Sequence, residues 1–132
     1  MNEQVLYYTP APSEADFLLL TAVLSMGIRL NKVEAAQLHE QVGALAGLPG
    51  YALQNLQADA APADIPEKFM ILQGFSEKRL DAFLAFLREN KMPPVLKAVL
   101  TGTNAQWTMA ALYKELRAEH DAIAAQKQKD RQ

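Results

Sequence analysis

Hydrophobic and polar positions in the first third of the chain predict a strand, a helix and a second strand. Residues 5–8 (VLYY) form a short β-prone run that the following Thr-Pro-Ala-Pro ends. Ser13 is a suitable N-cap for a helix that runs to Met26, and Gly27 is placed to end that helix. Residues 28–33 then alternate between apolar and polar side chains, as in a strand with one solvated face.

A second helix and a linker are predicted next. Residues 35–46 place Leu38, Val42 and Leu45 on one helical stripe, and the sequence GLPG ends the helix. Residues 51–66 are rich in Ala, Gln, Asp and Pro, and we interpret them as a linker between two halves of the protein.

The second half repeats the plan of the first. Residues 69–72 are β-prone, and Ser76 is placed to cap a helix with an apolar stripe of Leu80, Phe83, Leu84 and Leu87. A pair of prolines stops this helix, and residues 95–100 are a fourth strand. A last amphipathic helix follows Trp107, and residues 126–132 form a polar tail.

These elements predict one α/β domain over residues 1–125, with halves at about 1–50 and 67–125. Two halves related by a pseudo-twofold give an α+β fold of pseudo-duplicated βαβ units, the ferredoxin-like split βαβ sandwich. Such a fold has a four-stranded antiparallel sheet with helices on one face, and here an extra helix follows each half. The alternative is a four-stranded doubly wound α/β sheet, since a helix follows each strand. We favour the first, because the linker is long enough for the second half to reverse direction.

The first helix differs from its counterpart in the second half. Counted from the capping serines, Leu18, Thr21, Ser25 and Met26 correspond to Asp81, Leu84, Arg88 and Glu89. A helix that is apolar nearly all round needs cover on two sides. We favour cover by the helix over residues 35–46, and the alternative is a dimer interface.

Composition excludes several classes of protein. The 132 residues carry 13 basic and 15 acidic side chains, a net charge of −2, without the basic cluster of a nucleic-acid-binding protein. Cysteine is absent, which excludes disulfides and thiolate chemistry. Residues 17–28 are the most apolar segment, yet they reach only about half of the ~20 residues that a membrane-spanning helix needs. No signal peptide is recognisable. We therefore expect a cytoplasmic protein with no nucleic-acid or membrane partner.

The polar turn before the last helix is the one candidate ligand-binding site. Its residues are Lys97, Thr101, Thr103, Asn104 and Trp107. Backbone N–H groups and hydroxyls would converge there near the positive end of a helix, forming an anion pocket. The competing interpretation is helix capping, in which Thr103 forms a capping box with Gln106 or Thr108 serves as the N-cap. We favour capping, because every residue of the loop has a local structural use.

No side chains have the pattern of a catalytic or metal centre. His39 and His120 are the only histidines, and they share no metal-ligand spacing. No motif places a nucleophile beside a base. We identify no catalytic residue, metal ligand or cofactor, and the sequence favours a protein that is not an enzyme.

Three segments resemble a family of uncharacterised bacterial domains of unknown function (DUF3783-like). They are LKAVLTGTNAQWT at residues 96–108, GALAGLPGY at residues 43–51 and MILQGFSEKRL at residues 70–80. Gly102 stands where the family often has proline. The resemblance implies an intact single-domain member of the family, and it implies no reaction, cofactor or catalytic residue.

From these observations we expect a regulatory or protein-interaction module. It would form a homodimer or bind another protein through the open face of its sheet or through the uncharged first helix. The alternative is a small-molecule or anion-binding domain that uses the loop at residues 101–104.

Overall fold

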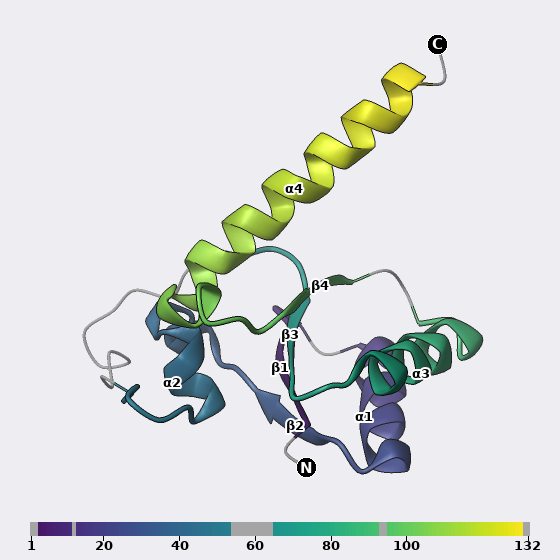
Figure 1. Ribbon diagram of the computed structural model, residues 1–132. Helices are drawn as coiled ribbons and strands as arrows, with labels where there is room; N and C mark the ends of the chain where they lie inside the picture. The colour runs from purple at the N-terminus through teal and green to yellow at the C-terminus, as the bar shows by residue number, and fades with distance from the viewer. Residues whose placement is uncertain (1–2, 12, 54–64, 93–94, 131–132) are drawn as a thin grey trace.

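The computed structural model describes residues 3–11, 13–53, 65–92 and 95–130. In chain order the elements are β1 (Gln4–Tyr8), α1 (Glu14–Met26), β2 (Arg29–Lys32), the 3₁₀ helix η1 (Ala35–His39), α2 (Val42–Ala46), β3 (Phe69–Gln73), α3 (Glu77–Glu89), β4 (Leu96–Val99), the 3₁₀ helix η3 (Asn104–Gln106) and α4 (Met109–Asp130) (Figure 1). The four strands lie where the sequence predicts them. Most of the predicted linker, residues 54–64, lies outside the described part.

The four strands form one mixed sheet in the order β2-β1-β3-β4. β1 and β2 are parallel, and so are β3 and β4. The central strands β1 and β3 are antiparallel, with Leu6 opposite Ile71. Each half is thus a parallel βαβ unit, and the two units meet side by side in opposite directions.

The ferredoxin-like arrangement is not confirmed, although the fold is a mixed α/β one. In a split βαβ fold, a strand of the other half lies between the two strands of each βαβ unit. Here the two strands of each unit are direct neighbours in the sheet. The sheet is therefore mixed, not antiparallel. The doubly wound alternative also differs, because its strands would all be parallel. The predicted reversal of the second half is confirmed by the antiparallel pairing of β1 with β3.

Helices cover both faces of the sheet (Figure 1). On one face, α1 and α3 pack against Val5, Tyr7, Met70 and Leu72. On the other face, η1, α2 and the start of α4 pack against Leu6, Tyr8, Phe69 and Ile71. Successive residues of β1 and β3 alternate between these two cores, as the pleat requires. The prediction of an open sheet face for a partner is therefore wrong, since both faces of the central strands are buried.

The helix predicted over residues 35–46 is two short helices on the face opposite α1. Between them Gln41 is extended and pairs with Thr108 in an isolated β-bridge. The N–H of Val42 also donates to the carbonyl of Trp107 at 2.8 Å. This pairing with a distant segment interrupts the helix. Because η1 and α2 lie across the sheet from α1, the predicted cover of α1 by this helix is wrong.

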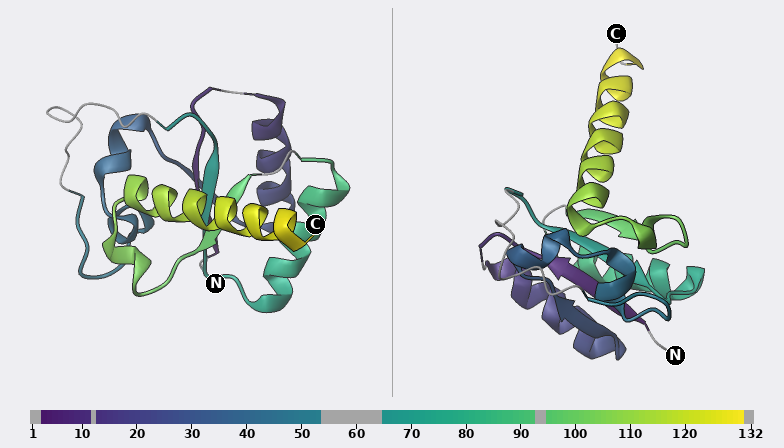
Figure 2. Two further views of the ribbon diagram at one scale, coloured as in Figure 1. Left: turned by 90° about the horizontal axis from the view of Figure 1, so that it is seen from above. Right: turned by 90° about the vertical axis from the view of Figure 1, so that its left-hand side faces the viewer.

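α4 leaves the body of the protein after its first turns (Figure 2). Met109 and Leu112 are buried, whereas the side chains of residues 117–126 are exposed, that of His120 among them. The helix continues to Asp130, through most of the segment predicted as a polar tail. Within the described residues, no helix combines the length and apolar character needed to cross a membrane.

Candidate functional site

The predicted loop at residues 101–104 is a turn held together by one side chain. The Oδ1 atom of Asn104 accepts a hydrogen bond from the N–H of Thr101 at 2.8 Å, and its Nδ2 donates to the carbonyl of Val99 at 3.0 Å. The hydroxyl oxygen of Thr101 accepts from the N–H of Asn104 at 3.1 Å. Asn104 is only 9% exposed, so its amide serves the turn and not the solvent.

Several backbone N–H groups at this loop already have hydrogen-bond partners, so they are not free to bind an anion. Those of Ala105, Gln106 and Trp107 donate to the carbonyls of Thr101, Thr103 and Asn104. The N-cap of α4 is Thr108, whose hydroxyl oxygen accepts from the N–H of Ala111 at 3.1 Å. Thr103 precedes η3 without a side-chain cap. This geometry supports the capping interpretation, with Thr108 as the capping residue.

Lys97 is not brought together with the loop. It lies opposite Met70 in the β3–β4 register, on the face of the sheet that carries α1 and α3. Its ammonium donates to the carbonyl of Val95 at 2.9 Å, and burial lowers the pKa of Lys97. The alternation of side chains along β4 predicts this orientation of Lys97, because its neighbours Leu96 and Ala98 face the core on the other side of the sheet.

The other four candidate residues line a shallow hollow of about 170 Å³ between the loop and α4. Its wall consists of Ala98, Thr101, Thr103, Asn104, Trp107, Leu112, Glu115, Leu116 and Glu119. Trp107 is 36% exposed, so it lies at the surface and not in the core. The lining residues include two carboxylates and no basic side chain, a charge balance that disfavours the predicted anion.

The loop, α3 and β4 lie in a segment that matches a known family model. Residues 68–123 match the model of a domain of unknown function (DUF3783). The match confirms the resemblance to a family of unknown function over these residues. Two of the three resembling segments, residues 70–80 and 96–108, lie inside the DUF3783 segment, and residues 43–51 lie outside it. No curated protein and no solved structure matches the chain.

A second candidate surface, outside the DUF3783 segment, is the outer side of α1. Phe17, Leu20 and Leu24 are 73%, 40% and 70% exposed, and with Thr21 they follow one helical line. We call these four residues the α1 stripe. The sequence contains no charged residue between Phe17 and Ile28. The sequence comparison of the two halves found this uncharged side but did not reveal that it stays uncovered.

A hollow of about 180 Å³ lies beside the stripe, between α1 and β2. It is lined by Tyr7, Ser13, Asp16, Phe17, Leu20, Leu30 and Lys32, and we call it the α1–β2 hollow. Its polar end is a fixed hydrogen-bonded pair, because the hydroxyl of Tyr7 donates to Asp16 Oδ1 at 2.7 Å. Burial and the neighbouring Asp16 raise the pKa of Tyr7.

Lys68 donates to the hydroxyl of Ser13 at 2.5 Å near the same hollow. Among the described residues, this Ser–Lys contact is the one that most resembles a nucleophile beside a base. A lysine activates a serine when burial removes water from its ammonium. This hydrogen bond is exposed, so its geometry supports a structural role. The part of the chain that the structure describes also contains no group of three His, Asp or Glu side chains placed to hold a metal ion.

Proposed function

We propose that this protein is a non-enzymatic protein-interaction module that self-associates through the α1 stripe. The observation that carries the proposal is the exposure of Phe17 and Leu24, at 73% and 70%, on a helix whose outer side has no cover among the described residues. Full burial of a leucine or phenylalanine side chain contributes about 1.5–3 kcal/mol. Three such side chains on each of two copies offset part of the entropy lost on association.

The contrast between α1 and α3 supports this proposal. Both helices pack on the same face of the sheet in equivalent βαβ units. The exposed side of α3 nevertheless carries charged residues, among them Lys78 and Asp81. The fold itself therefore does not require an uncharged outer side on the crossover helix, and association is a reason for α1 to have one.

The composition of α1 favours a protein partner over other macromolecules. A helix that lies on a membrane surface has Lys and Arg beside its apolar side. The sequence of α1, EADFLLLTAVLSM, contains neither. The net charge of −2 without a basic cluster disfavours nucleic acid. We also propose a cytoplasmic location.

The oligomeric mass tests the proposal. Light scattering on a sizing column should give twice the 14.6 kDa chain mass at concentrations of tens of micromolar or higher. Leu24→Glu should give the single-chain mass, because it places a charge in the stripe. Ile123→Glu is the matched control, since Ile123 is 57% exposed on the free part of α4, and it should leave the dimer unchanged. A wild-type protein that stays monomeric at every concentration contradicts the proposal.

Ligand binding at the loop is a second candidate function, and the exposed ring of Trp107 beside Leu112 and Leu116 favours it. Glu115 and Glu119 line the same hollow, so a ligand with an amine fits it better than an anion. Tryptophan fluorescence titrated with spermidine and with inorganic phosphate tests this candidate, because Trp107 is the sole tryptophan. An emission change with spermidine alone supports an amine ligand, and no change with either probe contradicts this candidate.

A further inference from the structure

We infer that the partner is a second copy of this chain, packed antiparallel across a twofold axis, with Leu24 of each copy in the α1–β2 hollow of the other. The inference rests on the proposed self-association and adds its geometry. Three features of α1 and β2 lead to it: the spacing of the stripe, the position of the hollow and the distribution of charge.

The spacing of the α1 stripe is the same when the helix is read in either direction. Its residues stand at positions i, i+3, i+4 and i+7 of the helix. An antiparallel second copy centred on the stripe therefore places Leu24 against Phe17 and Leu20 against Thr21, and the same contacts occur twice. A closed dimer of this kind leaves neither copy with an exposed apolar stripe.

The hollow and the most prominent leucine lie at opposite ends of the stripe. Phe17 and Leu20 line the hollow in the N-terminal half of α1, whereas Leu24 projects from the C-terminal half with 70% exposure. Reversal brings Leu24 of one copy to the hollow of the other. A cavity of about 150 Å³ accepts a benzene-sized group. The hollow of about 180 Å³ therefore has room for a leucine side chain, and Leu30 adds an apolar wall.

Charge favours the antiparallel orientation over the parallel one. The first turn of α1 contains Glu14 and Asp16, and its last turn contains no basic residue. Parallel packing would bring the acidic first turns of two copies together. Antiparallel packing instead places Lys32, which lines the hollow near the start of α1, at the end of the other copy's α1. The carbonyl groups at that helix end carry partial negative charge. Arg79 of the same copy binds the carbonyl of Met26, and Lys32 of the other copy complements the rest of that charge.

The edge of the sheet is a less favourable site for a second copy than α1. β2 is an edge strand, so a second copy could in principle extend the sheet there. An antiparallel pairing centred on β2 would set Arg29 of one copy opposite Lys32 of the other. Like charges in direct cross-strand positions are destabilising. We therefore assign the contact to α1 and not to strand pairing.

Disulfide cross-linking distinguishes the orientations, because the natural chain contains no cysteine. Thr21→Cys stands next to the inferred twofold axis and keeps all three apolar side chains of the stripe. Under mild oxidation it should form a covalent dimer in most of the protein. Glu14→Cys is the matched variant at the helix end, and its sulfur atoms would lie about 20 Å apart along an antiparallel pair but adjacent in a parallel one. It should stay uncross-linked.

The outcomes separate the geometry from the proposed function. If light scattering gives a dimer but Glu14→Cys cross-links, or neither variant does, the antiparallel geometry is overturned and self-association stands. If the wild-type protein is a monomer, the proposed function fails and the geometry fails with it. Light scattering under reducing conditions shows whether each cysteine variant still associates.

Lys32→Glu provides a second readout. It should raise the dissociation constant of the dimer about fivefold or more, because the symmetric dimer contains the contact between Lys32 and a helix end twice. Lys78→Glu, the same reversal at an exposed position on α3, should leave the dissociation constant unchanged. Equal effects of the two reversals would overturn the assigned role of Lys32.

Discussion

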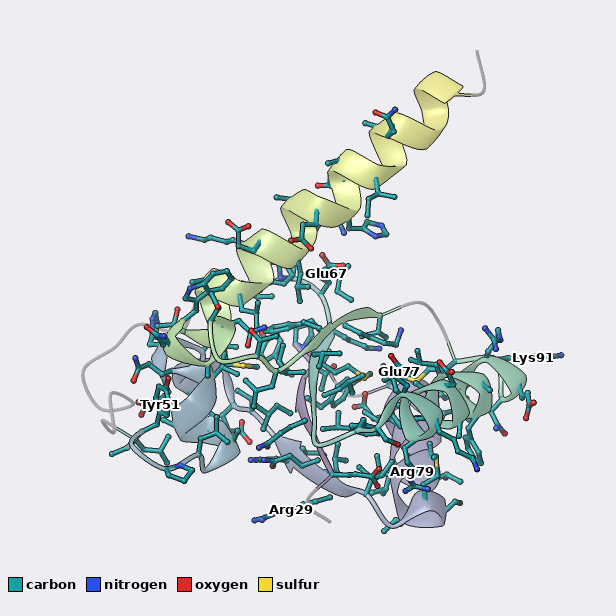
Figure 3. The ribbon with its side chains drawn as sticks, in the orientation of Figure 1. Arg29, Tyr51, Glu67, Glu77, Arg79 and Lys91 are labelled. Atoms are coloured by element: carbon teal, nitrogen blue, oxygen red, sulfur yellow. The ribbon has the colours of Figure 1, made fainter. Side chains whose placement is uncertain are left out.

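Arg79 forms a bidentate ion pair with Glu3 through two nitrogen atoms of its guanidinium group, across a separation of 76 residues in the sequence. Nε donates to Glu3 Oε2 at 2.8 Å, and Nη2 donates to Oε1 at 2.7 Å. Nη2 also donates to the carbonyl of Met26. The first turn of α3 is thereby tied to the start of β1 and to the end of α1 (Figure 3). This one side chain links the two βαβ units at the end of the sheet.

This pair predicts a loss of stability in acid. The hydrogen bonds from Arg79 hold the pKa of the Glu3 carboxyl below its usual value of about 4.3. A group whose pKa is lowered by folding contributes stability above its unfolded pKa and loses it as the pH falls through the folded pKa. We therefore expect Glu3→Gln to lower the melting temperature at pH 7 and to have little effect near pH 2. Glu77→Gln, on the exposed first turn of α3, is the control and should lower the melting temperature at pH 7 less than Glu3→Gln does, because the contact with Arg79 is made by Glu3.

The ring of Tyr51 lies directly on Gly43, which explains a glycine inside α2 (Figure 3). A Cβ atom at position 43 would come within 2.9 Å of that ring. We expect Gly43→Ala to destabilise the protein by about 1–3 kcal/mol, as overpacking of a buried contact does. Chemical denaturation measures the change in the free energy of unfolding.

A double-mutant cycle identifies the cause. In a Tyr51→Ala background the clash is gone, and Gly43→Ala should then be neutral or stabilising because alanine favours helix. Gly47→Ala should be destabilising in both backgrounds, because Gly47 has a φ of +76° and no atom within 4 Å of an added Cβ. A cost of Gly43→Ala that persists without the Tyr51 ring would show that the ring is not its cause.

Local elements were predictable from sequence because their signals are local. The N-cap at Ser76 accepts a hydrogen bond from the N–H of Arg79, and Gly27 ends α1 with a φ of +70°, both at the predicted positions. The layers of the fold were not predicted. Residues 5–8 and 69–72 are continuous apolar runs, and such runs are typical of strands buried on both faces. That signal indicates helices on each side of the sheet.

The candidate site was only partly predictable. Hydrogen bonding of the loop depends on which way the Asn104 amide points, and a sequence does not show this. The exposure of α1 depends on the position of η1 and α2 on the opposite face of the sheet, which is a tertiary outcome without a local signal in the sequence. The side of the sheet on which Lys97 lies is predictable from sequence, because strict alternation along β4 places its side chain away from the loop.

Asn104 should be the residue on which the loop depends most. Asn104→Ala removes the acceptor for the N–H of Thr101 and the donor to the carbonyl of Val99. We expect a loss of about 1–3 kcal/mol in the free energy of unfolding and faster hydrogen exchange at the N–H of Thr101. Asn104→Asp keeps the acceptor and should keep that N–H protected. Equal exchange rates in the two variants would contradict the assigned hydrogen bond.

Glu67 holds the first turns of α4 against the body through two side chains (Figure 3). The hydroxyl of Tyr113 donates to Glu67 Oε1 at 2.6 Å, and Nη1 of Arg117 donates to the same atom at 3.0 Å. Burial and the nearby Glu67 raise the pKa of Tyr113 to about 12. A phenol whose pKa is raised by folding contributes stability below its unfolded pKa of about 10 and loses it as the pH rises through the folded value.

Alkaline titration checks this contact. Followed by ultraviolet absorbance, part of the tyrosine ionisation of the wild-type protein should occur near pH 12. Tyr113→Phe should remove that part, while the late ionisation of Tyr7, whose pKa is also raised, remains. Glu67→Gln should shift the Tyr113 transition toward pH 10, since the neutral amide no longer opposes the phenolate charge. Asp121→Asn is the matched control, because Asp121 pairs with Arg117 at 3.1 Å without a hydrogen bond from Tyr113. It should move the transition less than Glu67→Gln does, and the reverse order would place the anchor of α4 on Asp121 instead of Glu67.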